Sequence, residues 1–158
     1  MLTADTLEDQ IDDEQWWTPL QASIEGLQPR LIRLRRRLHA IPEASGCEQQ
    51  TTLLLAEILR DAGITPTLME NGCGLIADIH LGAPSNTFVA LRSELDAVNV
   101  HDNKSVPYAS TQPDLCHACG HDAHTSILMA TALTINKHLQ DLSTIKFRHN
   151  LRVLSLIH

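Results

Sequence analysis

The densest group of reactive side chains lies in residues 116–125, whose sequence is C-H-A-C-G-H-D-A-H-T. The segment holds three histidines, two cysteines and one aspartate. Imidazole nitrogen, thiolate sulfur and carboxylate oxygen are the donors that bind a borderline-soft divalent ion such as zinc. Core packing does not account for so many polar groups side by side, because each would need a partner if buried. The segment therefore predicts a metal site.

Cys119 and His121 are the candidate ligands within this segment. Gly120 lies between them and allows the backbone to turn tightly. A helix is predicted to begin directly afterwards, and the partial positive charge of a helix N-terminus favours a thiolate and a neutral imidazole. Both are the forms that bind metal.

Two other interpretations of the segment remain open. A structural zinc site normally takes four ligands from two separated pairs, and no second Cys/His pair of that kind follows in the sequence. A thiol redox protein is the other alternative, because a C-x-x-C pair before a helix, here Cys116 and Cys119, suits thiol exchange.

Apolar spacing predicts the elements that must position this segment. Leu27, Leu31, Leu34 and Leu38 form one stripe of a helix that should end before Pro42. A second helix is predicted over 48–62, with Gly63 just past its end. A third is predicted over 123–139, with Ile127, Ala130, Leu133 and Thr134 facing inward. Strands are predicted at residues 65–70, 74–80, 87–92 (a buried strand) and 151–157.

The order strand, loop, helix, strand in the second half predicts a βαβ unit. The fold class is therefore α/β, with a mixed, largely parallel sheet flanked by helices. Residues 94–122 form a long polar loop between the third strand and the third helix. In open α/β sheets ligands bind beyond the carboxyl ends of the strands, so this loop is the expected site.

Composition limits the classes of function. The net charge is −7, but six acidic residues and no basic ones lie within residues 1–14, so the remainder is nearly neutral and nucleic acid is not an expected partner. We expect residues 1–20 to be an acidic tail and residues 21–158 to be one domain. No apolar run approaches the roughly 20 residues that span a membrane. The acidic N-terminus is unlike a signal peptide, so we expect a cytoplasmic protein with free thiols.

Several segments together resemble a known family. H-A-C-G-H-D-A-H-T at 117–125 closely resembles the signature of the aminoacylase, hippurate hydrolase and auxin-conjugate hydrolase family, which are metallopeptidase-like amidohydrolases. R-R-L-H-A-I-P-E at 36–43, G-L-I-A-D-I at 74–79, A-L-R-S-E-L-D-A-V at 90–98 and P-Y-A-S at 107–110 are also similar to family segments. The resemblance covers the chain from about Leu27 onward.

The resemblance implies the N-terminal part of a metallopeptidase-like catalytic domain that hydrolyses the amide bond of N-acyl amino acids. It implies two divalent ions, which could be Zn, Mn, Co or Ni. Cys119 would be a bridging or direct thiolate ligand and His121 a second ligand. Asp96 would be a carboxylate that orients a ligand or tunes the site. The further candidates for the surroundings of the metals are His117, Asp122 and His124.

The sequence also departs from the family pattern. Glu94 stands where the family usually has Asp, Asn99 where it has Pro, and Cys116 where it has Met. The family's general base belongs to a later Glu-Glu pair, and the sequence contains no such pair. The lid or dimerisation domain, through which full-length relatives dimerise, is also absent. We therefore expect residues 21–158 to be a truncated catalytic domain with little activity alone, the alternative being a non-catalytic remnant or a metal-binding module.

Overall fold

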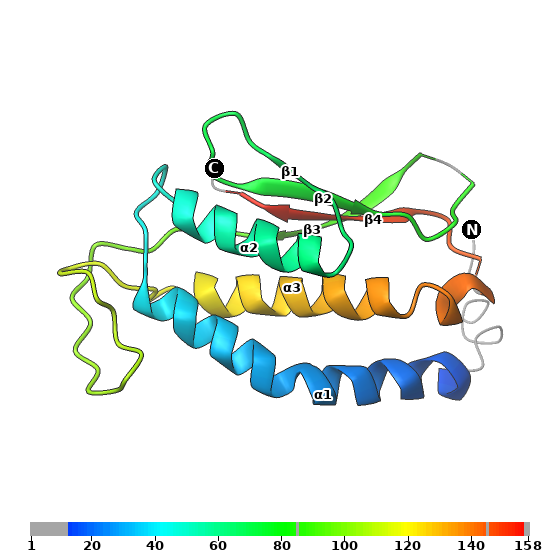
Figure 1. Cartoon of the computed structure of the whole chain (residues 1–158), viewed down its shortest axis with the longest axis horizontal. Helices are drawn as coiled ribbons and strands as arrows, with labels where there is room; N and C mark the ends of the chain where they lie inside the picture. The colour runs from blue at the N-terminus through cyan, green and yellow to red at the C-terminus, as the bar shows by residue number, and fades with distance from the viewer. Residues whose placement is uncertain (1–12, 85, 145, 157–158) are drawn as a thin grey trace, which may run out of the picture.

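The fold is α/β, with helices packed against one face of a four-stranded sheet (Figure 1). The computed structural model describes residues 13–84, 86–144 and 146–156. The helices are α1 (Asp13–Ala40), α2 (Gln49–Asp61) and α3 (His121–Lys137), followed by the short 3₁₀ helix η3 (Asp141–Thr144). The strands are β1 (Pro66–Leu68), β2 (Leu75–Ile79), β3 (Phe88–Ser93) and β4 (Asn150–Ser155).

The first helix ends at Ala40, before Pro42 as predicted, but it begins at Asp13, well before the leucine stripe. It contains Pro19 and Pro29. Proline lacks the N–H of the helical ladder and its ring crowds the carbonyl four residues earlier, so it bends a helix. Figure 1 shows such a bend partway along α1. The helix runs across the predicted boundary between an acidic tail (1–20) and a domain (21–158), and this division stays a prediction. Residues 1–12 lie outside the described part of the chain.

The strands lie in the order β1-β2-β4-β3, and the sheet is mixed as predicted. The parallel pairing of β3 with β4 across α3 confirms the βαβ unit. The pairings β1–β2 and β2–β4 are antiparallel, however, so the sheet is not largely parallel. The first of these pairings follows from the turn between β1 and β2, where the Gly72 N–H donates to the Met69 carbonyl at 2.9 Å and Gly72 has a φ of +76°, so that the chain folds back on itself.

The core lies between the sheet and the helices α2 and α3, and α1 packs on the outer side of α3 (Figure 1). Leu55, Leu59, Leu75 and Met129 are among its fully buried side chains. No helix in the described ranges combines the length and the apolar character needed to cross a membrane.

Two predicted burials are wrong. The strand predicted as buried at 87–92 forms the edge strand β3, and Val89 and Leu91 on it are 52% and 37% exposed. A strand at the edge has a neighbour on one side only, and apolar composition alone does not reveal that position. Ile127, predicted to face the core, is 63% exposed, because α3 turns Leu128 and Met129 inward instead.

Candidate metal centre

The candidate centre forms where the loop leaves the carboxyl end of β3 and where α3 begins. Glu94 follows β3 directly and His121 is the first residue of α3, so the parallel β3–α3–β4 arrangement brings them together. The Thr125 hydroxyl donates a hydrogen bond to the Glu94 carbonyl (2.9 Å) and fixes the strand end to the helix. Gly120 precedes the helix with a φ of +84°, a left-handed conformation that favours glycine.

His121 lies between two carboxylates. Its Nδ1 is 2.9 Å from Asp96 Oδ1 and 3.0 Å from the Asp96 carbonyl oxygen. Its Nε2 is 3.1 Å from Glu94 Oε2. Both Asp96 oxygens can only accept, so Nδ1 carries the proton that it donates to them. A neutral ring would then direct the Nε2 lone pair at the Glu94 carboxylate, and two acceptors this close require a positive charge between them.

A proton shared by His121 and Glu94 can supply that charge, and so can a metal ion. One oxygen of Glu94, one of Asp96 and one nitrogen of His121 lie within 4.8 Å of one another. Carboxylate and imidazole are ordinary ligands of zinc and similar divalent ions. All three residues are partly buried, so the donors fit a divalent cation that is reached from solvent.

The structure gathers only part of the predicted site. His121 and Asp96 lie together as expected. In the described ranges this is the one group of carboxylate, imidazole and thiol donors close enough to hold an ion, and Cys119 is outside it. Cys119 is an exposed free thiol, so its role as a ligand stays a prediction. His124 is exposed, with its ring centre 6.1 Å from that of His121.

Asp122 belongs to a second, buried polar cluster that the sequence did not predict. His39 on α1 is fully buried, and its Nδ1 is 2.6 Å from Asp122 Oδ2. The same carboxylate oxygen forms an ion pair with Arg35, whose Nε lies 2.9 Å away. The cluster therefore ties α1 to the first turn of α3, directly beside His121.

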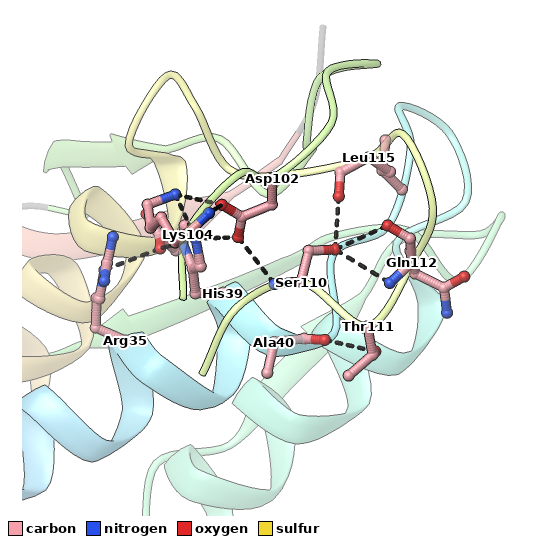
Figure 2. Close-up of polar contacts among 10 residues, drawn as sticks. Arg35, His39, Ala40, Asp102, Lys104, Ser110, Thr111, Gln112 and Leu115 are labelled. Carbon is pink, nitrogen blue, oxygen red and sulfur yellow. Dashed lines mark hydrogen bonds and ion pairs between the residues drawn. The ribbon is translucent and has the colours of Figure 1, made fainter. Parts of the chain in front are cut away.

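The other nitrogen of His39 faces the long loop, as Figure 2 shows. His39 Nε2 is 3.2 Å from Asp102 Oδ2 and 3.1 Å from Lys104 Nζ. Asp102 also accepts hydrogen bonds from Lys104 Nζ (2.8 Å) and from the Ser110 N–H (2.9 Å). These donors hold the pKa of the Asp102 carboxyl well below its usual range, Lys104 contributing most. The His39 imidazole is therefore surrounded by two carboxylates and two cations whose charges cancel. The carboxylates are those of Asp102 and Asp122, and the cations are Arg35 and Lys104.

A further anchor fixes the loop to the end of α1. Thr111 donates to the Ala40 carbonyl through its N–H (3.0 Å) and through its hydroxyl (2.6 Å) (Figure 2). The bridge between Val98 and Cys116 closes the loop on itself. The predicted long polar loop is therefore held in place by α1 rather than being free.

His117 lies between the two clusters. It is 5% exposed, and neither of its ring nitrogens has a hydrogen-bond partner among the described residues. Burial lowers the pKa of its imidazole, which keeps the ring neutral, although the nearby Asp122 acts in the opposite direction. A neutral imidazole without a partner is costly to bury, and such a group is common beside functional sites. Its predicted place near the metals therefore stays open.

The redox alternative receives no direct support from geometry. Cys116 is buried and its backbone is paired with Val98, whereas Cys119 is exposed, and both thiols are free.

Sequence reasoning missed Glu94 as a donor, although its position two residues before Asp96 was a usable signal. It also missed His39, whose partners lie 63 and 83 residues away in sequence.

Comparison with known proteins supports the assignment to a family. Residues 90–155 match the profile of peptidase family M20/M25/M40. A Rhodococcus jostii (strain RHA1) protein named as a glutamate–cysteine ligase is 40% identical over 122 residues, which are 77% of this chain and 15% of that protein. The N-acetyl-L-cysteine deacetylase of Bacillus subtilis (strain 168) is 35% identical over 122 residues, 76% of this chain and 29% of that protein.

The same relationship is visible in the fold. The crystal structure of the Bacillus subtilis YXEP protein, described as a dinuclear metal-binding peptidase from the M20 family, matches with a TM-score of 0.72 and 28% identity. The match covers 83% of this chain and 35% of that one. The chain thus spans about a third or less of the length of these relatives. Together, these findings identify residues 90–155 as sequence of the M20 peptidase family, within a fold that this chain shares with an M20 peptidase.

Proposed function

We propose that this chain forms part of the metal-binding half of an amidohydrolase that cleaves N-acyl amino acids. The observation that supports it best is the position of His121, which donates to Asp96 through Nδ1 and directs Nε2 at Glu94. A carboxylate that accepts the outer N–H of a histidine fixes the ring and makes its inner nitrogen a better ligand. The relative named as an N-acetyl-L-cysteine deacetylase supports the substrate class.

In this proposal His121 and Glu94 hold a divalent ion and Asp96 orients the imidazole. Cys119 is the further ligand that the family resemblance assigns. When bound, such an ion would supply Lewis-acid chemistry at the amide carbonyl and would help to activate water. The residues of this chain contribute positioning: Thr125 fixes Glu94, and the His39–Asp122 contact fixes the first turn of α3.

The substrate would be small, and the long loop would be the element of this chain nearest to it. Dimerisation is proposed from the family resemblance, and a cytoplasmic location from the free thiols of the cysteines. A non-catalytic metal-binding module is the second candidate, because the donor group is present in a chain that spans 29% of the deacetylase.

Calorimetric titration with Zn²⁺ and with Mn²⁺, followed by elemental analysis, tests the proposal. We expect stoichiometric binding that His121→Ala abolishes and Asp96→Asn weakens by about 10–100-fold, the usual effect of losing an orienting partner. His101→Ala is the matched control, because His101 is exposed and its contact with Asp114 is 3.5 Å long. Binding that survives His121→Ala, or no binding at all, would refute the metal centre.

Hydrolysis of N-acetyl-L-cysteine by the same preparations separates the two candidates. Turnover that stops on chelation and in His121→Ala supports the amidohydrolase. Metal uptake without turnover supports the metal-binding module for these 158 residues, and this is what we expect if the general base belongs to the family's Glu-Glu pair. Turnover that persists after chelation contradicts both.

A further inference from the structure

Two cysteines away from the metal centre lie on neighbouring segments. Cys47 precedes α2, and Cys73 lies in the turn between β1 and β2. This turn packs against the start of α2, where the Gly74 N–H donates to the Thr52 hydroxyl at 2.7 Å. The Cys73 thiol donates to the Gly46 carbonyl oxygen at 3.2 Å. The sulfur of Cys73 therefore touches the peptide group that joins Gly46 to Cys47.

Covalent geometry bounds the separation of the two residues. Across a trans peptide, a carbonyl oxygen lies roughly 3 Å from the next Cα, and the described part of the chain has no cis peptide. Added to the 3.2 Å contact, this places the Cys73 sulfur at most about 6 Å from Cys47 Cα. In a disulfide a sulfur lies within about 5 Å of the partner Cα, because the reach from that Cα to its own sulfur and one S–S bond add up to this length. Rotation of the exposed Cys47 side chain, with a shift of its backbone of about 1 Å, therefore brings the two sulfurs to bonding distance.

The surroundings give the two thiols different roles. Cys47 is exposed and Cys73 is 3% exposed. Glu48 is fully buried beside them: its Oε1 accepts the Gly46 N–H at 3.0 Å, and its Oε2 has no hydrogen-bond partner among the described residues. Burial raises the pKa of the Cys73 thiol; the backbone of Glu48 acts in the opposite direction through a hydrogen bond, and the charge of the Glu48 side chain raises the pKa again. Cys47 is therefore the thiol that reacts first with an oxidant from solvent, and Cys73 is the thiol that reacts second.

We propose that Cys47 and Cys73 form a peroxide-oxidisable pair that closes into a disulfide between the start of α2 and the β1–β2 turn. The Cys47 thiol gives its proton to solvent, and the thiolate attacks the O–O bond of a hydroperoxide, becomes a sulfenic acid and releases hydroxide or alkoxide, which takes a proton from solvent to leave as water or alcohol. Oε2 of Glu48 takes the proton of Cys73, whose sulfur attacks the Cys47 sulfur. The S–O bond breaks and hydroxide leaves, taking up that proton as water. The two thiols lose two electrons and the hydroperoxide gains them.

Tryptic mapping under non-reducing conditions tests this pair in the intact chain. Trypsin places Cys47 on peptide 38–60 and Cys73 on peptide 61–92, while Cys116 and Cys119 share peptide 105–137. After treatment with hydrogen peroxide and alkylation, we expect a species that joins 38–60 to 61–92. Cys47→Ser should abolish it, and the double variant Cys116→Ser, Cys119→Ser should retain it.

Glu48→Gln tests the role of the carboxylate. We expect the cross-link to form at least tenfold more slowly, while the Cys47 sulfenic acid still forms and is trapped by dimedone. An unchanged rate overturns the assignment to Glu48. Recovery of 38–60 and 61–92 unlinked, a bond found only within 105–137, or a bond only between two copies of 38–60 overturns the pair itself. None of these outcomes depends on metal binding or on hydrolysis.

Discussion

The buried cluster around Asp122 predicts a large cost for a small chemical change. The substitution Asp122→Asn preserves the shape of the side chain and removes its charge. Asp122 Oδ2 accepts from His39 Nδ1 and forms an ion pair with Arg35 Nε, and Oδ1 accepts from the Ala123 N–H at 2.8 Å. In asparagine one of these positions becomes an NH₂ group, so at least one donor must face another donor.

The size of the effect follows from burial. A hydrogen bond to a charged group contributes about 1.5–3 kcal/mol. We assign about 2 kcal/mol to the His39 contact, which is buried on both sides, and about 1 kcal/mol to the Arg35 contact, because solvent screens a guanidinium that is a third exposed. The variant should therefore lose about 3 kcal/mol of unfolding free energy, a large share of the 5–15 kcal/mol typical of a domain.

Urea unfolding followed by circular dichroism measures this difference. The matched control is Asp141→Asn, because Asp141 Oδ2 lies 2.7 Å from His138 Nδ1 and its side chain is 61% exposed. An exposed pair of this kind contributes about 0–1 kcal/mol, so the control should change little. If Asp122→Asn costs no more than Asp141→Asn, burial is not what makes the His39–Asp122 contact strong, and the reasoning fails.

Further predictions concern the sheet and two glycines. A hydrogen bond from Arg152 lowers the pKa of Asp78 below its ordinary 3.8. Because the pKa is lower in the folded state, the ion pair stabilises the fold fully at pH values above 3.8. This contribution disappears as the pH falls through the folded-state pKa. The urea midpoints of the wild type and Asp78→Asn should therefore differ at neutral pH and converge in acid, and a constant difference would contradict the ion pair. Gly74→Ala should lower the melting temperature strongly, since its Cβ would lie 2.8 Å from the Ser155 carbonyl oxygen at a φ of +109°. Gly26→Ala, within α1 and with open space around it, should stabilise by about 0.5–1 kcal/mol in the same melting experiment; equal effects of both changes would refute the packing argument.

Local sequence signals predicted the element ends well. Pro42 and Gly63 marked the ends of α1 and α2 to within two residues, because both residues act on the backbone beside them. The start of α1 was missed, since Pro19 and Pro29 argue against a helix and only the packing of α1 on α3 outweighs them. The exposure of β3 was missed for a related reason, as its position at the sheet edge depends on how distant strands pair.

In the candidate site, too, features set by local sequence were predicted and features set by long-range packing were missed. His121 was predicted from the metal-binding donors of its segment and Asp96 from the family resemblance, and the structure brings the two within hydrogen-bonding distance. The contact between His39 and Asp122 spans 83 residues, and no local pattern of spacing or composition encodes it. Asp122 could therefore be identified as a residue of interest, but not its partner.

The position of β4 has a consequence for how the chain assembles during synthesis. This strand, Asn150–Ser155, pairs with β2 on one side and with β3 on the other. Until it leaves the ribosome, the β1–β2 hairpin and β3 have no shared neighbour, and joining them requires closing loops of many tens of residues, which slows folding. A chain ending before Asn150 would hold a hairpin and a lone strand rather than a sheet, so β4 is the strand that joins the earlier strands into one sheet.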